Sequence, residues 1–430
     1  MLIKNVRLIN PVTDTDMICD ILISDGRIKK IAPGNSIETG DKDVIDATGL
    51  TAAPGFVDVH VHFRDPGYTH KEDIYTGAEA AAAGGFTTVV MMANTDPAID
   101  NEETLKYVLD KGRETKINVL SVANVTKGLK GKELVDMENL KRKGAVGFSD
   151  DGIPVLDKDL LKQAFIRAAE LKVPVSLHEE DPRFIVNNGI DSGRIAKELG
   201  ISGSDRMAEI SMIERDIKLA EGTGCDIDIQ HISSKEGVCL VREARKNNKH
   251  IHAEATPHHF SLTMDAVLEH GSYAKMNPPL RDEEDRLAII EGLKDGCIEM
   301  IATDHAPHSA KEKAGDITKA PSGIIGLETS FALANTELCK KGHLTLSELV
   351  ERMSSGPARV YSLDECAGSV EEGRPADIVI FDENEEWTVE GFKSRSSNSP
   401  FIGRKLTGRV RYTVCKGEIV YSCQKDLKTG

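Results

Sequence analysis

Residues 54–66 have the sequence Pro-Gly-Phe-Val-Asp-Val-His-Val-His-Phe-Arg-Asp-Pro, in which an unbroken β-prone run carries two histidines. Side chains alternate between the faces of a strand with a period of two, so His60 and His62 are expected on the same side. A His-x-His pair also occurs by chance as an ordinary core or surface feature. Here the pair closes a hydrophobic strand, and Arg64 and Asp65 follow at the junction with a loop. Two imidazoles at one strand end indicate half of a metal site, of a kind that suits zinc and its transition-metal neighbours.

Through the middle of the chain, β-prone runs alternate with amphipathic or alanine-rich segments that have the helical period. Eight strands alternating with helices are typical of the α/β class, and specifically of a (β/α)8 TIM-type barrel. The predicted strands are residues 56–63, 87–92, 117–123, 145–148, 173–178, 226–231, 250–255 and 298–303. The predicted helices include residues 76–83, 102–113, 159–171, 208–220, 237–247 and 284–295.

Short β-prone runs separated by turns occupy both ends of the chain. They are residues 2–9, 20–24, 27–31 and 44–46 at the N-terminal end, and 376–381, 408–415 and 418–421 at the C-terminal end. Each end alone has too few strands to bury a face. We therefore predict one small β-sandwich domain built from residues 1–53 and 365–430, beside a barrel domain of residues 54–364.

The carboxyl ends of the predicted barrel strands, where such barrels place their active sites, collect six candidate metal ligands. They come from five strands and are His60, His62, one aspartate of the Ser149-Asp150-Asp151-Gly152 turn, His178, His231 and Asp304. Random placement of 13 histidines would not favour one rim. The ordinary alternatives are that His178 and His231 cap loop carbonyls and that the two aspartates only form a turn. Spacing alone does not choose between Asp150 and Asp151.

Composition excludes several classes of function. The chain has 430 residues and a formal net charge of -16, so the basic face that nucleic-acid binding requires is not expected. No window approaches the roughly 18 apolar residues of a membrane helix, and the N-terminus lacks the plan of a signal peptide, which predicts a cytoplasmic protein without a membrane partner. Eight scattered cysteines without a Cys-x-x-Cys spacing indicate free thiols.

With these residues assembled, the chain resembles the amidohydrolase superfamily and, within it, the class I dihydroorotases. The resemblance covers nearly the whole chain and rests on specific motifs. They are residues 54–67, Asn94-Thr95, Phe148-Ser-Asp-Asp-Gly152, His178-Glu179-Glu180, Gln230-His231-Ile232-Ser233, Met276-Asn-Pro-Pro-Leu280 and Ala302-Thr-Asp-His-Ala-Pro-His308. The resemblance implies reversible, metal-dependent hydrolysis of dihydroorotate to carbamoyl aspartate, a step of pyrimidine biosynthesis.

The resemblance also implies a binuclear Zn²⁺ site, with two ions per chain. One metal would be held by His60, His62 and Asp304, the other by His178 and His231. Asp151 would bridge them, because no lysine stands at the end of strand four, where many superfamily members have a carboxylated lysine, and Lys158 lies well past it. Asp304 would also be the catalytic base, which takes a proton on attack and returns it to the leaving nitrogen.

Substrate recognition requires a partner for a free carboxylate, and a guanidinium is the side chain best matched to it. Arg64, two residues beyond His62, is placed for that role. The further substrate-binding residues that the resemblance implies are His62, Asn94, Asn277, His308, Ser322 and Gly323. The chain departs from the family beside two of them, with Ala93 in place of a usual proline and Ser322 in place of a usual phenylalanine.

Two alternatives stay open at this point. Another cyclic amidohydrolase, a hydantoinase or allantoinase, would share the metal ligands, although Arg64 and the aspartate bridge count against it. A catalytically silent relative that scaffolds aspartate transcarbamoylase would be expected to lack ligands, and all six are present. The sequence does not decide whether the chain forms a homodimer or a complex with aspartate transcarbamoylase, and it assigns no role to the loop 183–206.

Overall fold

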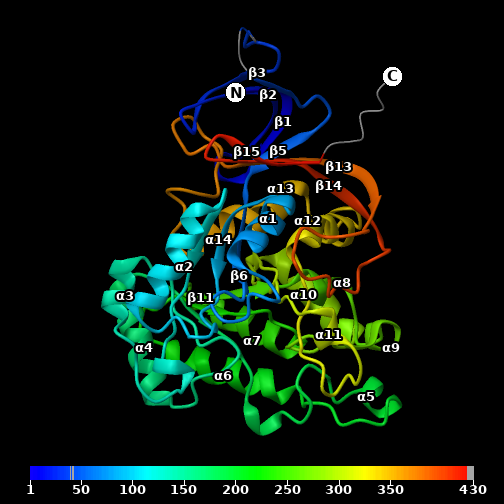
Figure 1. The fold of residues 1–430 in the computed structure, drawn as a ribbon. Coiled ribbons are helices and arrows are strands. Elements are labelled where there is room, and N and C mark those ends of the chain that lie inside the picture. Colours follow the sequence, from blue (N-terminus) through cyan, green and yellow to red (C-terminus); the bar gives the residue numbers. More distant parts are fainter. Residues whose placement is uncertain (39, 41–42, 424–430) are drawn as a thin grey trace.

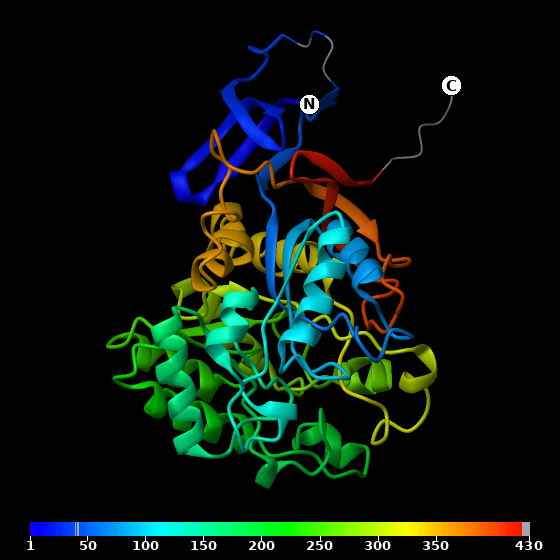
Figure 2. The ribbon, with the colours of Figure 1, turned by 60° about the vertical axis from the view of Figure 1, so that its left-hand side comes forward.

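The computed structural model describes residues 1–38, 40 and 43–423, and in it the two ends of the chain share one sheet. Its strand order is β15-β14-β13-β5-β1-β2-β3, with β4 paired to β1. In both views these strands lie together at one end of the molecule (Figures 1 and 2). The strands are β1 Leu2–Asn10, β2 Thr15–Ser24, β3 Arg27–Pro33, β4 Val44–Asp46, β5 Thr51–Pro54, β13 Ile378–Thr388, β14 Lys405–Cys415 and β15 Glu418–Ser422. Residues 424–430 of the predicted C-terminal module lie outside the described residues.

Strand β5, which the sequence did not predict, joins the strands of both ends into one continuous sheet. It pairs in parallel with β1 and antiparallel with β13, where Pro54 lies opposite Ile378. Its sequence, Thr-Ala-Ala-Pro, has little of the β-branched and aromatic character that marks strands, so the sequence did not reveal it.

The strands of the central region pair in parallel. They form two groups, β6-β7-β8 and β12-β11-β10-β9. Isolated parallel bridges from Phe148 to Ala123 and to Val175 join the groups on one side, and a bridge from Val61 to His305 joins them on the other. The parallel pairing thus runs in a closed circuit through eight chain segments. The strands are β6 Phe56–Val61, β7 Phe86–Met91, β8 Asn118–Ser121, β9 Val175–Leu177, β10 Ile227–Ile229, β11 Ile251–Ala255 and β12 Met300–Ile301.

Residues 145–148 do not form the predicted strand, because Phe148 is the one residue of this segment that forms β-bridges. Phe148 donates its N–H to the carbonyl of Pro174 at 3.1 Å and accepts from Ser176 at 2.9 Å. Pro174 has no N–H to return, and Gly147 weakens extended structure, so the ladder does not extend.

Helices follow most of these strands. The sequence-predicted helices are present as α1 Ile74–Ala83, α2 Glu102–Glu114, α4 Lys158–Leu171, α6 Met207–Ala220, α7 Lys235–Arg245 and α10 Glu283–Asp295. Local capping starts several of them: the Asp73 carboxylate accepts from the Thr76 N–H at α1, and Asn101 does the same for Thr104 at α2. The remaining α-helices are α3 Met137–Lys143, α5 Arg194–Glu198, α8 Pro257–Ser261, α9 Ala266–His270, α11 Ala310–Lys313, α12 Ser330–Ala334, α13 Leu346–Val350 and α14 Gly356–Val360.

Aromatic packing connects the two parts of the fold. Phe56 of β6 stacks on Phe331 of α12 with ring centroids 5.5 Å apart, and Phe331 lies 4.4 Å from Phe381 of β13. All three rings are buried. The first strand of the circuit is thereby fixed against the terminal sheet, which holds the end of β6 where the paired histidines lie.

All eight cysteines are free, as predicted. In the part of the chain that the structure describes, none of the helices has the length and apolar character needed to cross a membrane.

Candidate metal centre

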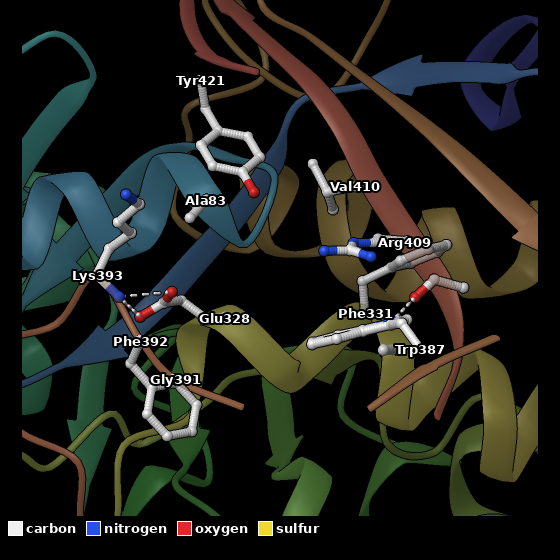
Figure 3. A pocket seen from close by; sticks show the side chains of 12 residues that line it. Ala83, Glu328, Phe331, Trp387, Gly391, Phe392, Lys393, Arg409, Val410 and Tyr421 are labelled. Carbon is white, nitrogen blue, oxygen red and sulfur yellow. Dashed lines mark hydrogen bonds between the residues drawn. The ribbon is translucent and has the colours of Figure 1, made fainter. Parts of the chain in front are cut away.

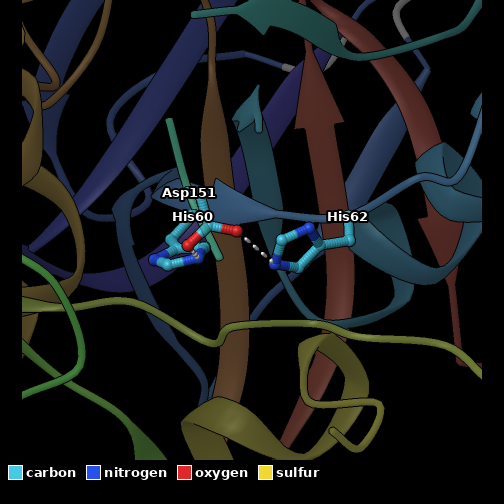
Figure 4. Close-up of side chains that lie close together, drawn as sticks. All are labelled: His60, His62 and Asp151. Atoms are coloured by element: carbon cyan, nitrogen blue, oxygen red, sulfur yellow. Dashed lines mark ion pairs between the residues drawn. The ribbon is translucent and has the colours of Figure 1, made fainter. Parts of the chain in front are cut away.

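Three predicted ligands meet at the end of β6. His60, His62 and Asp151 are buried, and one donor atom of each lies within 4.8 Å of the others. The Asp151 carboxylate faces both imidazoles, with Oδ1 3.6 Å from His60 Nε2 and Oδ2 3.5 Å from His62 Nε2 (Figure 4). Asp304 closes this group, since its Oδ1 is 3.1 Å from His62 Nε2 and 3.6 Å from His60 Nε2.

Asp151 also belongs to a second group, with His178 and His231. His178 Nδ1 lies 3.5 Å from Asp151 Oδ1 and 3.1 Å from His231 Nε2. The same carboxylate oxygen therefore faces a histidine of each group. The carboxylate of Asp151 could therefore contact a metal ion in each group.

The neighbouring carboxylate, Asp150, turns away from the cluster. It accepts from the N–H groups of Val125, at 2.8 Å, and Thr126, at 3.1 Å, and so supports a turn. Lys158, the first residue of α4, is exposed. The structure thus places Asp151 in both groups of candidate ligands. Asp150 and Lys158 belong to neither group.

A buried nitrogen atom without a hydrogen-bond partner indicates whether these residues suit a cation. Among the described residues, His60 Nε2 is buried without a hydrogen-bond partner, while Nδ1 of the same ring lies 3.0 Å from Glu254 Oε2. A histidine ligand typically donates its other nitrogen to a carboxylate in this way, which fixes the tautomer and leaves a lone pair for the metal. With carboxylates and further imidazoles around it, the donor set suits zinc or a similar divalent ion.

The charges of the second group are strongly coupled. Against the desolvation caused by burial, hydrogen bonds to Asp151 and Glu180 raise the pKa of His178 to about 10. Burial would raise the pKa of Asp151, but its contacts with the histidines hold that pKa well below the usual range. Without a cation, the Asp151 carboxylate attracts a proton onto an imidazole, and a metal ion would take that proton's place.

Backbone conformation is unusual at three site residues. Arg64, His231 and Asp304 have φ values of 57°, 33° and 47°, in the left-handed region that side chains other than glycine rarely adopt. Such strain persists only where surrounding structure enforces it, and it concentrates at functional sites. All three residues follow strand ends.

Arg64 is largely unpaired. Its only hydrogen bond among the described residues runs from Nε to the Pro307 carbonyl at 3.4 Å, and no carboxylate forms an ion pair with it. Burial lowers the pKa of Arg64, although the nearby carboxylates of Asp304 and Asp151 oppose that shift. The two terminal nitrogens are left available for an anion.

Two predicted substrate contacts, Asn94 and Asn277, lie within hydrogen-bond distance of predicted metal ligands. The Asn94 amide lies between His62 Nδ1, 3.1 Å from its oxygen, and Asp151 Oδ2, which accepts its N–H at 2.8 Å. Asn277 donates to Glu180 at 3.1 Å and lies 3.3 Å from His178 Nε2. Both amides thus lie beside the metal centre.

His308, Ser322 and Gly323 form a connected group. His308 Nε2 donates to the Ser322 carbonyl at 2.9 Å, which leaves Nδ1 to accept from Lys71 at 3.4 Å. Burial, with the nearby cations, lowers the pKa of His308 to about 2, so the ring is neutral. Gly323 has a φ of 113°, and a Cβ there would lie 2.6 Å from Ala306 Cβ, so the loop requires glycine.

The loop 183–206, to which the sequence assigned no role, reaches this group. Asn188 donates to Glu180 Oε1 at 3.0 Å and accepts from the Ser322 hydroxyl at 2.6 Å. The sequence reasoning missed Glu180 and Glu254. Glu254 could have been found as a charged residue within β11, a strand whose side chains are all buried; the spacing of Glu180, two residues after His178, was a weaker signal.

A separate cavity of about 370 Å³ lies between β14 and the helix α12 (Figure 3). Phe331, Trp387, Phe392 and Tyr421 give it aromatic walls. The half-buried carboxylate of Glu328 in its lining accepts from the N–H groups of Lys393 and Ser394. The lining includes none of the predicted metal ligands or substrate contacts, so this cavity is distinct from the metal centre.

The parallel circuit with two histidine–carboxylate groups at its rim defines the amidohydrolase class of protein. In agreement, residues 315–421 match the model of the amidohydrolase family, and residues 49–237 match the dihydro-orotase-like model. A solved structure of an L-hydantoinase (dihydropyrimidinase) from Arthrobacter aurescens superimposes with a TM-score of 0.88 at 27% identity, over 99% of this chain and 96% of that one.

Relatives with higher sequence identity indicate a particular family within this class. A dihydroorotase of Clostridioides difficile is 55% identical over 98% of this chain and 100% of its own length. A dihydroorotase of Clostridium acetobutylicum is 50% identical, covering 98% of this chain and 99% of its own length. The chain belongs to the dihydroorotase family.

Proposed function

We propose that the chain is a dihydroorotase, which opens the ring of dihydroorotate by hydrolysis to carbamoyl aspartate and catalyses the reverse closure. This is a step of pyrimidine biosynthesis. The observation that carries the proposal is the position of Asp151, whose Oδ1 lies 3.6 Å from His60 Nε2 and 3.5 Å from His178 Nδ1. One carboxylate between two histidine groups supports a binuclear centre. The choice of dihydroorotate as substrate is supported by membership of the dihydroorotase family.

Two Zn²⁺ ions are the proposed occupants. His60, His62 and Asp304 would hold one, His178 and His231 the other, and Asp151 would contact both. When bound, such ions lower the pKa of a shared water and polarise the scissile carbonyl.

Asp304 is the proposed general base. Water attacks the ring carbonyl carbon, and the Asp304 carboxylate accepts the proton that the water loses. As the ring carbon–nitrogen bond breaks, the same proton passes to the departing nitrogen, so that one water is consumed and the carboxylate is regenerated. The contact between Asp304 Oδ1 and His62 Nε2, at 3.1 Å, supports this placement at the reacting centre.

Arg64 is proposed to select the substrate. Its unpaired terminal nitrogens suit the free carboxylate of dihydroorotate, which hydantoins and dihydropyrimidines lack. The similarity to an L-hydantoinase structure makes cyclic amides without that carboxylate the natural comparison substrates.

The architecture is part of the same proposal. We interpret the closed circuit of parallel pairing as a (β/α)8 barrel of residues 54–364, with a smaller domain built from 1–53 and 365–430. The continuous sheet supports that division, because β5, at the first domain boundary, pairs with β13 of the C-terminal segment.

The deciding experiment is an assay of purified, zinc-loaded protein that follows the ring opening of dihydroorotate. A panel with hydantoin, allantoin and dihydrouracil should show dihydroorotate as the preferred substrate by catalytic efficiency. Preference for a ring without a carboxylate would reassign the chain to another amidohydrolase activity. Zinc-loaded protein that opens none of these rings would favour the scaffold alternative.

A further inference from the structure

Lys313, the last residue of α11, is a fully buried lysine with an unusual set of partners. Its side chain is 0% exposed. The ammonium donates to the carbonyls of Pro321, at 2.9 Å, and Gly323, at 3.0 Å, with that of Lys275 at 3.5 Å. Among the described residues it forms no ion pair, although buried lysines are almost always paired with a carboxylate. Three backbone carbonyls surround the charge.

The partners of Lys313 belong to two segments that carry predicted substrate contacts. Pro321 and Gly323 flank Ser322, and Lys275 lies two residues before Asn277. The two segments are also bonded directly, because the Gly323 N–H donates to the Lys275 carbonyl at 2.9 Å. The Lys313 ammonium therefore contacts both segments.

A second buried lysine holds the same loop from the other side. The Lys275 ammonium donates to the carbonyls of Ile317, at 2.9 Å, and Ala320, at 2.7 Å, and it too makes no ion pair among the described residues. Burying an ammonium without a counter-ion is costly. Two such groups on one loop indicate that holding its backbone in place outweighs that cost.

We propose that Lys313 is a positioning residue for the substrate, whose ammonium fixes the Pro321–Gly323 backbone against the segment leading to Asn277. The inference rests on the proposed function, because it assumes that these segments contact the dihydroorotate ring. Lys313 itself touches neither the predicted metal ligands nor Arg64. Its loss should therefore weaken substrate binding while leaving the metal centre intact.

The test compares Lys313→Met with Lys311→Met. Both variants remove one lysine charge from α11, but Lys311 is exposed. Leaving a buried carbonyl without its donor should raise the KM for dihydroorotate by about five- to thirty-fold in Lys313→Met. Its zinc content should stay unchanged and its kcat should stay within about two-fold, while Lys311→Met should match the unmodified protein.

A pH profile of the unmodified protein gives a second readout. Burial, assisted by the Lys275 ammonium, lowers the pKa of Lys313 to about 7. Besides Lys275, the charged groups nearby are Lys71 and Glu312, which pair with each other at 3.0 Å, and His308 is neutral. Below pH 7 the ammonium has three N–H donors for three carbonyls, and above it the neutral amine has two. KM should therefore rise as the pH increases through about 7, and Lys313→Met should lose that step.

These outcomes separate the inference from the proposed function. Unmodified protein that does not open dihydroorotate contradicts the proposed function. Active unmodified protein with an unchanged KM in Lys313→Met, or with zinc and kcat lost together, contradicts only the positioning role. If Lys313→Met does not fold, the pH profile decides: a KM that is flat between pH 6 and 8, a range of about one unit on either side of that pKa, overturns the inference.

Discussion

Glu254 Oε2 lies 3.0 Å from His60 Nδ1, so a buried carboxylate on β11 sets the tautomer of a predicted metal ligand on β6. Glu254 is fully buried. The contact directs the orphaned Nε2 of His60 into the cluster. His60, which the sequence identified as a ligand, is thus oriented by Glu254, which the sequence did not identify.

Glu254→Gln should weaken metal binding by about ten- to hundred-fold, because the amide no longer fixes the tautomer of His60. Titration against a competing chelator measures this directly. Glu299→Gln is the matched control, since Glu299 contacts His252 Nδ1 at 2.9 Å, another histidine of β11 outside the cluster. Equal metal affinity in the two variants would show that Glu254 does not support the site.

The metal content itself is a prediction. Zinc-loaded protein should contain about two divalent ions per chain, and His60→Ala or His178→Ala should abolish turnover by loss of metal. Elemental analysis and the ring-opening assay check this together. His343→Ala, at a histidine outside both groups, should leave metal and activity unchanged. Active protein without a transition metal would contradict the proposed mechanism.

Asp151 and Asp150 provide a test of the bridge. Asp151→Ala should lose bound metal and activity, whereas Asp150→Ala should retain the metal and lose about 1 to 3 kcal/mol of stability, because two buried N–H groups lose their acceptor. Elemental analysis and thermal unfolding distinguish the variants.

Activity of the unmodified protein should not depend on bicarbonate, since Asp151 needs no carboxylation. Recovery of Asp151→Ala with carbon dioxide, in the absence of any short carboxylic acid, would instead indicate a lysine bridge.

Much of the candidate site could be predicted because strand periodicity is local. The period of two placed His60 and His62 on one side, and the rule that barrel sites lie at strand ends selected His178, His231 and Asp304. The choice between Asp150 and Asp151 could not be made from spacing. It depends on the N–H groups of residues 125 and 126, which lie on the neighbouring strand connection.

The strand predictions that were wrong or absent also depend on non-local contacts. Strand β5 forms because β1 and β13 lie on either side of it, and its own sequence does not favour a strand. The run at residues 145–148 does favour one, but its neighbour contains Pro174. Hydrogen bonds between segments far apart in sequence decide each of these cases.

The last prediction concerns Arg64, where metal chemistry and substrate choice separate. Arg64→Met keeps much of the apolar stem but removes the guanidinium, so both metals should remain. Truncating one member of a buried charge pair costs about 2 to 5 kcal/mol, which corresponds to roughly thirty-fold to several-thousand-fold in catalytic efficiency on dihydroorotate. Dihydrouracil has no carboxylate to lose, and its turnover should change little. Metal content and both efficiencies are the measurements. Equal losses on the two substrates, or metal lost with activity, would show that Arg64 supports the site and does not recognise the carboxylate.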